Sequence, residues 1–293
     1  MTQSLRLLAN GLPGLAEPVT PDGLASLHDS WARDVAALGP WRSEGDVFSP
    51  ATPTGDDTIV CGPCGSTMDV ARELFSRGQL DEWGSVLAPA QSAGRGQLRR
   101  PWLSQAGNLF VTLRCPEAPD KWAELRPLVL GFLLARALDD DTGAVRLKWP
   151  NDLLVADRKV GGMLIEERQG CVLAGFGLNL AWAPGAEDLR QDHAVQAGIF
   201  SPKNPDLGPA RLWSSLVKQV KTGYGTLLDA CTPTEFLAIF QARLAWAGRR
   251  VLVREGAHAA YEARIVGVSD TGGLVLEHHG RRVCLCAGDV TPL

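Results

Sequence analysis

The feature that most constrains this chain is a cationic, glycine-punctuated stretch, Gln91–Trp102, between two apolar runs. Both runs, Ser85–Ala88 and Asn108–Leu113, have the composition of short β-strands. A connection this long and this basic is too elaborate for a plain hairpin. Its glycines let backbone N–H groups approach an anion, and its arginines supply forked donors suited to carboxylate or phosphate. Taken alone, such a stretch is more often a solvated basic loop. Other motifs must therefore decide whether this one binds an anion.

Two further unusual stretches lie downstream. The first is Arg146–Val155, which contains Lys-Trp-Pro-Asn-Asp and is followed by Lys159 and Gly162. The second is Ala174–Leu180, which contains Gly-Phe-Gly-Leu-Asn. Lys-Trp-Pro-Asn-Asp with the following lysine and glycine is a specific signal, whereas Gly-x-Gly-x-Asn alone is a weak one.

In order and spacing, these stretches resemble the biotin protein ligases. The family pattern is a Ser-Thr-Asn turn, Gly-Arg-Gly-Arg-x-Gly-Arg-x-Trp, Lys-Trp-Pro-Asn-Asp, Lys-x-x-Gly-Ile-Leu and Gly-x-Gly-x-Asn. The resemblance is strong over residues 58–180 and weak in the C-terminal part. It implies an α+β fold, a mixed β-sheet packed against helices, with a small C-terminal SH3-like β-barrel.

The local patterns agree with that fold and predict three domains. They are an acidic, partly helical or irregular extension (1–57), a catalytic biotin/ATP-binding domain (58–246) and a C-terminal SH3-like β domain (247–293). At 293 residues the chain is long enough for one large core and a small appended domain. One N-terminal helix is expected, capped by Asp22 and carrying an apolar stripe from Leu24 to Leu38.

Apolar runs and turn residues predict the other elements. Thr58–Val60 is the first core strand, and a helix over 68–77 is capped by Ser66 or Thr67 and ended by Gly78. The remaining core strands are expected at 145–149, 153–155, 160–166 and 171–180, and the remaining helices at 125–138, 210–228 and 233–245. Four short strands are expected in the tail, at 251–253, 261–268, 273–277 and 283–286.

Some biotin ligases carry an N-terminal DNA-binding module, but charge argues against one here. Residues 1–57 hold three arginines and no lysine against eight acidic side chains, a formal charge of −5. A DNA-binding module needs a basic surface to meet the phosphates. We therefore expect no DNA partner.

Cysteine usage and hydropathy indicate a cytoplasmic protein. Seven cysteines is an odd number in a chain too large to need a disulfide framework, which favours a reducing compartment. No apolar run approaches the ~20 residues that span a bilayer, and the N-terminus is a poor secretory signal. Cys61-Gly-Pro-Cys64 fits a redox pair, or a zinc site with Cys284 and Cys286, but we favour packing of small apolar side chains at a strand end.

The chemistry implied by the resemblance is acyl-adenylate formation. A carboxylate attacks the α-phosphate of ATP, and the repulsion of these anions at ~4 Å amounts to ~4 kcal/mol at an effective dielectric of ~20. Fixed cations must cancel it, and Arg95, Arg100 and Lys159 are the candidates. The resemblance makes Lys159 and Arg95 catalytic, with Lys159 reaching both the carboxylate and the α-phosphate.

The resemblance also divides the site residues into two groups. The biotin side comprises Ser66, Thr67, Met68, Gln91, Gly94, Arg95, Gly96, Lys159, Gly162, Gly175 and Gly177, of which the last three glycines form a flat wall for the bicyclic ring. The ATP side comprises Gln97, Arg100, Trp102, Lys148, Asn151, Asp152 and Asn179. Mg²⁺ accompanies ATP, with Asp152 positioning it or orienting the loop, and no residue is assigned as a metal ligand.

Simpler roles remain open for several of these residues. Ser66 and Thr67 can act only as a helix cap, and Lys148 only as a strand anchor. Asp152 can be a turn residue after Asn151. Gly175 and Gly177 can mark a bulge or tight helix–sheet packing, since the strand that contains them is otherwise apolar and reads as buried.

Three positions depart from the family pattern. Met68 replaces the asparagine of the Ser-Thr-Asn turn, Gln97 replaces the second arginine of Gly-Arg-Gly-Arg, and Arg99 replaces the glycine that follows. Gln97 brings no positive charge to an adenylate, so either Arg99 compensates or the loop folds differently.

The sequence therefore predicts an ATP-dependent biotin protein ligase, a biotin–[acetyl-CoA-carboxylase] ligase, acting as a monomer or homodimer. It would use biotin, ATP and Mg²⁺, form biotinyl-5'-AMP, and modify a lysine of a biotin carboxyl carrier domain. The alternatives are a lipoate-type ligase on the same fold, and a non-catalytic biotin-binding protein with Gln97 and Met68 as signs of decay. No membrane partner is expected.

Overall fold

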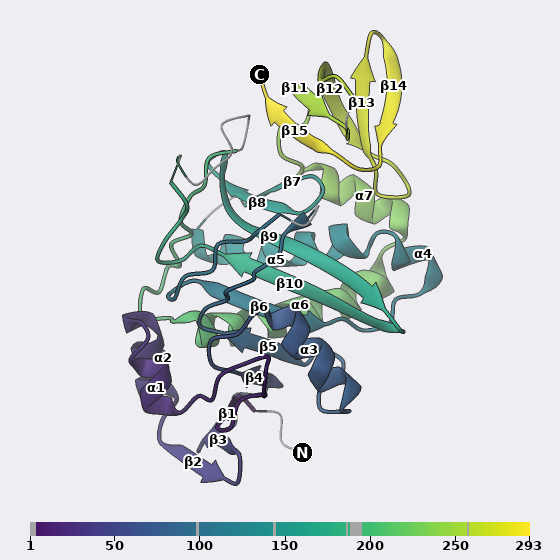
Figure 1. Ribbon diagram of the computed structural model, residues 1–293. Helices are drawn as coiled ribbons and strands as arrows, with labels where there is room; N and C mark the ends of the chain where they lie inside the picture. The colour runs from purple at the N-terminus through teal and green to yellow at the C-terminus, as the bar shows by residue number, and fades with distance from the viewer. Residues whose placement is uncertain (1–3, 98–99, 143–144, 186, 188–194, 257) are drawn as a thin grey trace. The chain divides into compact units, whose positions relative to one another are not determined.

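The computed structural model describes residues 4–97, 100–142, 145–185, 187, 195–256 and 258–293 (Figure 1). The chain forms two compact units that interleave along the sequence. Unit 1 contains Met1–Glu117, Gly161–Ala183 and Ile199–Lys221, and unit 2 contains Ala118–Val160, Pro184–Gly198 and Thr222–Leu293. The expected boundary at residue 57 lies inside unit 1.

Unit 1 is built on a mixed β-sheet whose strand order is β2-β3-β1-β4-β5-β6-β10-β9. The β1–β4 and β4–β5 pairs are parallel, and the other pairs are antiparallel, which confirms the predicted mixed sheet. The strands are β1 (Arg6–Leu8), β2 (Trp41–Glu44), β3 (Val47–Pro50), β4 (Thr58–Val60), β5 (Ser85–Ala88), β6 (Leu109–Arg114), β9 (Arg158–Arg168) and β10 (Cys171–Leu178). Strand β9 begins in unit 2 and enters unit 1 at Gly161.

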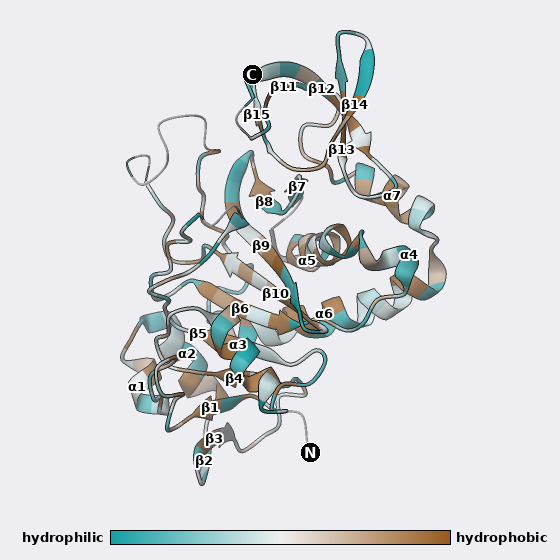
Figure 2. Cartoon of the chain, turned by 45° about the vertical axis from the view of Figure 1, so that its right-hand side comes forward, coloured by the Kyte–Doolittle hydropathy of each residue, from teal (hydrophilic) through white to brown (hydrophobic). Residues whose placement is uncertain are grey.

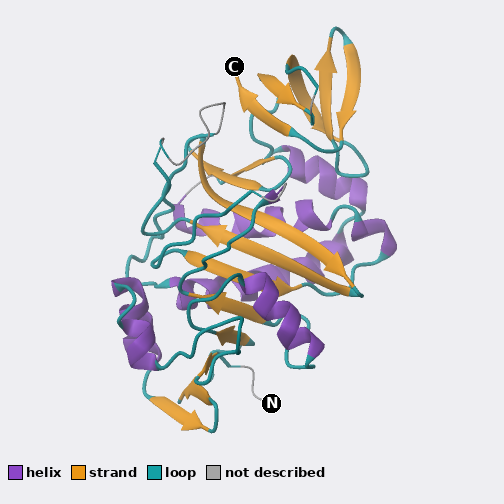
Figure 3. Ribbon diagram, viewed as in Figure 1, coloured by secondary structure: helices purple, strands orange, loops and turns teal. Residues whose placement is uncertain are grey.

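Helices cover the two faces of this sheet (Figure 3). On one face α3 (Thr67–Ser76) packs against β5, β6 and β10. On the other face, Trp213 of α6 (Pro209–Ala230) packs against Phe176 of β10 at 5.6 Å between ring centroids. Because side chains alternate along a strand, the glycines that flank Phe176 face the α3 side. Figure 2 shows β5 and β6 as mostly hydrophobic, in keeping with their burial.

The helix α3 begins and ends within one residue of the predicted 68–77. The Ser66 hydroxyl accepts the Met68 N–H at the N-cap, and Gly78 takes a positive φ of 68° just beyond the C-terminal end. Its apolar face joins a core that also contains Cys61 and Cys64.

The N-terminal segment differs from the expectation in two ways. Its predicted single helix is two helices, α1 (Pro21–Ala25) and α2 (Asp29–Leu38), because His28 leaves the helical conformation and caps α2 with its ring nitrogen. Thr20, and not Asp22, caps α1. The segment also contributes β1, β2 and β3 to the sheet of unit 1, so Thr58–Val60 is not the first strand of the core.

Unit 2 combines helices, a β-hairpin and a separate antiparallel sheet. The helices α4 (Asp120–Ala123), α5 (Arg126–Thr142) and α7 (Pro233–Gln241) meet through the rings of Trp122, Phe132 and Phe236. Strand β7 (Arg146–Lys148) pairs with β8 (Asp152–Val155), and β8 turns into β9 through two residues of positive φ, Ala156 and Asp157. No helix in the described part of the chain is long and apolar enough to cross a membrane.

The C-terminal sheet has the order β14-β13-β12-β11-β15 and is of the predicted SH3-like type. Its strands are β11 (Arg250–Arg254), β12 (Tyr261–Val268), β13 (Leu274–His278), β14 (Arg281–Leu285) and β15 (Asp289–Pro292). The last strand was not predicted, because a four-residue segment with aspartate and proline lacks a strand pattern of its own. Figure 2 shows the hydrophilic character of β14, whose first four residues are exposed.

Candidate active site

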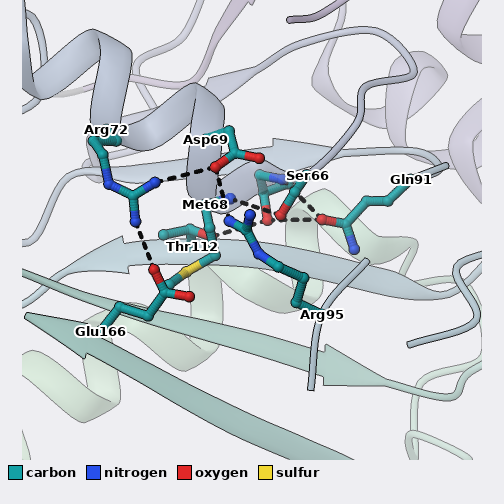
Figure 4. Close-up of polar contacts among 9 residues, drawn as sticks. Ser66, Met68, Asp69, Arg72, Gln91, Arg95, Thr112 and Glu166 are labelled. Atoms are coloured by element: carbon teal, nitrogen blue, oxygen red, sulfur yellow. Dashed lines mark hydrogen bonds and ion pairs between the residues drawn. The ribbon is translucent and has the colours of Figure 1, made fainter. Parts of the chain in front are cut away.

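The N-terminal turn of α3 carries a buried polar network in unit 1 (Figure 4). The Thr67 N–H and hydroxyl donate to Gln91 Oε1 at 2.8 and 3.1 Å. The Thr112 hydroxyl of β6 donates to the Thr67 hydroxyl at 2.9 Å. Ser66 is both the helix cap and a neighbour of this network, so capping and a binding role are compatible here.

Gln91 also fixes both ends of the arginine-rich loop, Gln91–Trp102. Its Nε2 donates to the Ser104 hydroxyl at 3.0 Å, and that hydroxyl donates to the Trp102 carbonyl at 2.9 Å. Gly94 must be a glycine, because a Cβ there would lie 2.5 Å from the Trp102 carbonyl oxygen.

Within the loop, the backbone folds back on itself. The Trp102 N–H donates to the Gly94 carbonyl at 2.9 Å, and the Gly96 N–H donates to the Arg100 carbonyl at 2.8 Å. Gln97 accepts the Arg100 N–H through its backbone carbonyl at 3.1 Å. Arg99, the proposed compensating cation, lies outside the described residues, and so does Leu98.

Three glycines, Gly162, Gly175 and Gly177, form what we call the glycine wall. Gly177 of β10 lies opposite Gly162 of β9 in the sheet register. The Met68 sulfur lies 3.1 Å from where a Gly175 Cβ would be, and the Trp102 ring lies 2.5–2.7 Å from a Cβ at Gly177. The wall therefore presents bare backbone to the Met68 thioether and to the Trp102 ring, and Trp102, expected on the ATP side, contacts it here.

Met68 occupies the position where the family pattern has asparagine. Its side chain is 4% exposed and rests on the glycine wall, so the residue contributes apolar contact surface and no hydrogen-bonding amide. Its neighbours Ser66 and Thr67 remain the polar groups of the turn.

A cavity of about 480 Å³ opens beside Gln91. Its lining includes Gly65 and Ser92 next to the predicted site, and Leu15 and Glu17 of the N-terminal segment. The N-terminal segment is held there by backbone hydrogen bonds, such as Gly65 N–H to the Leu15 carbonyl at 3.3 Å. Residues that were expected to lie in an extension thus line a cavity next to the site.

Two asparagines, Asn179 and Asn108, accept backbone N–H groups from the chain that follows β10. Asn179 is 4% exposed, and its carbonyl accepts the Phe200 N–H at 2.7 Å. Asn108, which precedes β6, accepts the N–H groups of Leu180, Ala181 and Trp182 with its Oδ1 at 2.8, 2.9 and 3.1 Å. Sequence reasoning missed Asn108, although an asparagine at the start of an apolar strand is a visible signal.

The second set of predicted residues lies in unit 2 and is organised around Asp152. Asp152 Oδ1 pairs with Lys159 Nζ at 2.6 Å, and Oδ2 pairs with Lys148 Nζ at 3.2 Å. Lys148 also pairs with Asp289 of β15 at 2.6 Å. The half-buried Asn151 precedes Asp152 in the turn between β7 and β8.

These charges perturb one another's titration. Burial alone would raise the pKa of Asp152, but Lys159 and Lys148 outweigh it and lower the pKa below its ordinary value. Burial alone would lower the pKa of Lys148, but Asp152 and Asp289 outweigh it and raise the pKa. Asp152 and Lys148 are therefore both charged at neutral pH.

Exposure separates the two lysines. The Lys148 side chain is 6% exposed and enclosed by carboxylates, whereas the Lys159 side chain is 30% exposed. Lys159 is thus the cation of this cluster that a dissolved anion can reach, and Lys148 has the character of a strand anchor.

The structure divides the predicted residues between the two units. Lys148, Asn151, Asp152 and Lys159 belong to unit 2, and all the other predicted site residues belong to unit 1. The two groups are joined along the chain by β9, which carries Lys159 three residues before Gly162 of the glycine wall.

Comparison with known proteins identifies the family. The sequence pattern of the biotin/lipoate A/B protein ligase family matches residues 63–179. The chain is 30% identical to a biotin–[acetyl-CoA-carboxylase] ligase of Paracoccus denitrificans over 220 residues, covering 70% of this chain and 88% of that protein. It is 30% identical to the enzyme of the same name from Mycobacterium tuberculosis over 243 residues, covering 80% of this chain and 88% of that protein.

The fold agrees with that of a solved structure. A biotin protein ligase from Aquifex aeolicus, in complex with biotin and ATP, superposes with a TM-score of 0.63 at 22% identity, covering 80% of this chain and 97% of that one. With the motifs and glycine wall described above, these similarities show that the chain belongs to the biotin protein ligases of the biotin/lipoate A/B protein ligase family.

Proposed function

We propose that this protein is a cytoplasmic, ATP-dependent biotin–[acetyl-CoA-carboxylase] ligase. It would join biotin to ATP as biotinyl-5'-AMP, release pyrophosphate, and then transfer the biotinyl group to one lysine of a biotin carboxyl carrier domain. The observation that carries the proposal is the position of Lys159. Its partly exposed side chain stands at the start of β9, three residues before the glycine wall on the same strand.

In the first step, a biotin carboxylate oxygen forms a bond to the α-phosphorus, and the bond from that phosphorus to the β-phosphate oxygen breaks. Charge on the phosphoryl oxygens develops as the pentavalent state forms, so fixed donors accelerate this step. We assign that role to Lys159 and Arg95.

In the second step, the neutral amine of the carrier lysine attacks the acyl carbon, and AMP leaves. The adenylate must be kept from water until the carrier arrives. We assign contacts with the biotinyl half to the Ser66–Met68 turn, Gln91, Gly94, Arg95, Gly96 and the glycine wall. We assign contacts with the nucleotide half to Gln97, Arg100, Trp102, Asn151 and Asn179.

Mg²⁺ is expected with ATP, but the arrangement around Asp152 does not fit a metal ligand. Both of its carboxylate oxygens are engaged by ammonium groups, from Lys159 and Lys148. No cluster of three or more His, Cys, Asp and Glu side chains that could hold a metal ion is found among the described residues. We therefore assign Asp152 to orienting the two lysines.

The proposal is tested by incubating the protein with ATP, Mg²⁺, labelled biotin and a biotin carboxyl carrier domain. Label is expected on the carrier. No label is expected on it when ATP is omitted or when the acceptor lysine is replaced by arginine. A parallel reaction with labelled lipoate separates the lipoate-type alternative. Tight biotin binding without ATP-dependent transfer would instead identify a non-catalytic biotin-binding protein.

The cysteine pair Cys61 and Cys64 is expected to be dispensable for this chemistry. Both are buried, and the Cys61 thiol donates to the Leu87 carbonyl at 3.5 Å. A hydrogen bond with Cys64 and burial both raise the pKa of Cys61, which keeps it an unreactive thiol. Replacing both by alanine should retain carrier labelling and cost about 1 kcal/mol of stability per site in urea unfolding. Lost labelling in a folded variant would revive a redox or metal role.

The N-terminal segment is expected not to bind DNA. Its formal charge of −5 repels phosphates, and its described part forms strands β1–β3 and two short helices of unit 1. A mobility-shift assay at low salt, with biotin and the regions upstream of the biotin genes, should give no specific complex. Saturable, sequence-specific retardation would contradict this prediction.

A further inference from the structure

Four charged side chains of alternating sign run across unit 1 beside the Ser66–Thr67 turn (Figure 4). Arg95 Nη2 of the arginine-rich loop contacts Asp69 Oδ1 at 2.8 Å. The same Asp69 oxygen accepts Arg72 Nη1 at 3.1 Å, and Arg72 Nη2 contacts Glu166 Oε2 at 2.6 Å. We call this row the ion-pair chain.

The ion-pair chain connects three elements far apart in the sequence. Asp69 and Arg72 lie on α3, Glu166 lies on β9, and Arg95 lies on the loop 26 residues after Asp69. Asp69 stands in the first turn of α3, where the helix dipole favours a carboxylate. Arg72 is fixed by two carboxylates and in turn fixes Asp69, so the acceptor for Arg95 is held on a rigid element.

The contact leaves Arg95 able to bind a second anion. A guanidinium has five N–H donors in a planar fork, and Asp69 engages one terminal nitrogen. The Arg95 side chain is 37% exposed, so a dissolved carboxylate or phosphate can reach the remaining donors. Without Asp69, a long arginine side chain on a glycine-flanked loop would sample many rotamers.

We propose that Asp69 is a positioning residue, which holds Arg95 in the orientation that receives the carboxylate of biotin. The inference rests on the proposed function, because it assumes that Arg95 meets that carboxylate. The competing role for Asp69 is purely structural, as a helix N-terminal acid that stabilises α3.

A matched set of variants separates the two roles. Asp69→Asn removes the charge at nearly constant shape, and Asp69→Glu keeps the charge on a longer arm. The control is Glu73→Gln, one turn further along the same helix, because Glu73 pairs with Arg77 at 2.7 Å at an exposed site. The assay is biotin-dependent ATP–pyrophosphate exchange, measured over a range of biotin concentrations.

For Asp69→Asn we expect the KM for biotin to rise about fivefold, the change that corresponds to losing one partly exposed ion pair. The kcat should change less than twofold and the melting temperature should match that of Glu73→Gln. Asp69→Glu should recover part of the effect. In the Arg95→Gln background, Asp69→Asn should raise the KM no further, since a residue that acts through Arg95 has nothing left to position.

Two results would assign Asp69 to helix stability and overturn the inference. One is an unchanged KM for biotin in Asp69→Asn. The other is a KM that Asp69→Asn raises by the same factor in the Arg95→Gln background as in the wild type. A second readout needs no activity. Trypsin cleavage after Arg95, followed by mass spectrometry, should be faster in Asp69→Asn than in Glu73→Gln, and equal rates would also overturn the inference. If the wild-type protein shows no biotin-dependent exchange, the proposed function fails, and the cleavage rates still decide whether Asp69 holds Arg95.

Discussion

Replacing Lys159 by alanine is expected to slow biotin-dependent ATP–pyrophosphate exchange by about 10²–10³-fold, a loss of ~3–4 kcal/mol of transition-state stabilisation. The Lys159 side chain is 30% exposed and stands at the first residues of β9, where it can approach an anion without being buried. An interaction with the α-phosphate strengthens as the phosphorus becomes pentavalent, so its loss should lower kcat as well as raise KM.

The stability of this variant should change much less. Asp152 loses the 2.6 Å contact with Lys159 but retains Lys148, so the free energy of unfolding should fall by only about 1 kcal/mol. Arg158→Ala, one residue earlier on the same strand and exposed to solvent, serves as the control and should exchange at a normal rate. A Lys159→Ala protein with near-normal exchange would refute the catalytic assignment and much of the mechanism with it.

Replacing Lys148 by methionine is expected to lower the free energy of unfolding by about 3–5 kcal/mol. Its main effect is thus on stability, whereas that of Lys159→Ala is on the reaction rate. The Lys148 side chain is 6% exposed and its ammonium pairs with both Asp152 and Asp289, so its removal leaves these two carboxylates with one fewer cation. Methionine restores the volume of the side chain but not its charge.

Urea unfolding of the wild type, Lys148→Met and the control Lys121→Met measures the effect. Lys121 is an exposed lysine on α4, and its replacement should cost less than about 0.5 kcal/mol. A loss below about 1 kcal/mol for Lys148→Met would contradict the anchoring role. The variant should lose exchange activity only to the extent that it unfolds.

The same cluster predicts how this stability difference depends on pH. The folded-state pKa of Asp152 is lowered, so its contribution is present above the ordinary value of 3.8 and disappears as the pH falls further. The folded-state pKa of Lys148 is raised, so its contribution is present below the ordinary value of 10.5 and disappears as the pH rises further. The difference between wild type and Lys148→Met should therefore be largest between these two values.

Much of the fold follows from local sequence. The runs at Thr58–Val60 and Ser85–Ala88 are strands at the predicted residues, and Ser66 caps the helix that follows. The physical reason is that side-chain alternation, helix capping and glycine turns are decided by residues within a few positions of each other. The family motifs also sufficed to predict the mixed sheet and the SH3-like tail.

Other features had no local signal. The strand β1 exists because Leu7 pairs with Val60 and Phe48, and β15 exists because Asp289–Pro292 pairs with β11. The break between α1 and α2 could not be predicted from the spacing of apolar residues, because that spacing continues across the residues where the backbone leaves the helix.

In the candidate site, the sequence by itself determined which residue types are present and in which order they occur. Only the tertiary structure decided which charges meet. Asp69 and Arg95 are 26 residues apart in the sequence, and Lys148 and Asp289 are 141 apart. Such pairs depend on how the chain folds back on itself and on how much water remains around each charge. These two quantities make Lys148 an anchor and leave Lys159 accessible, although both are lysines of the same motif region.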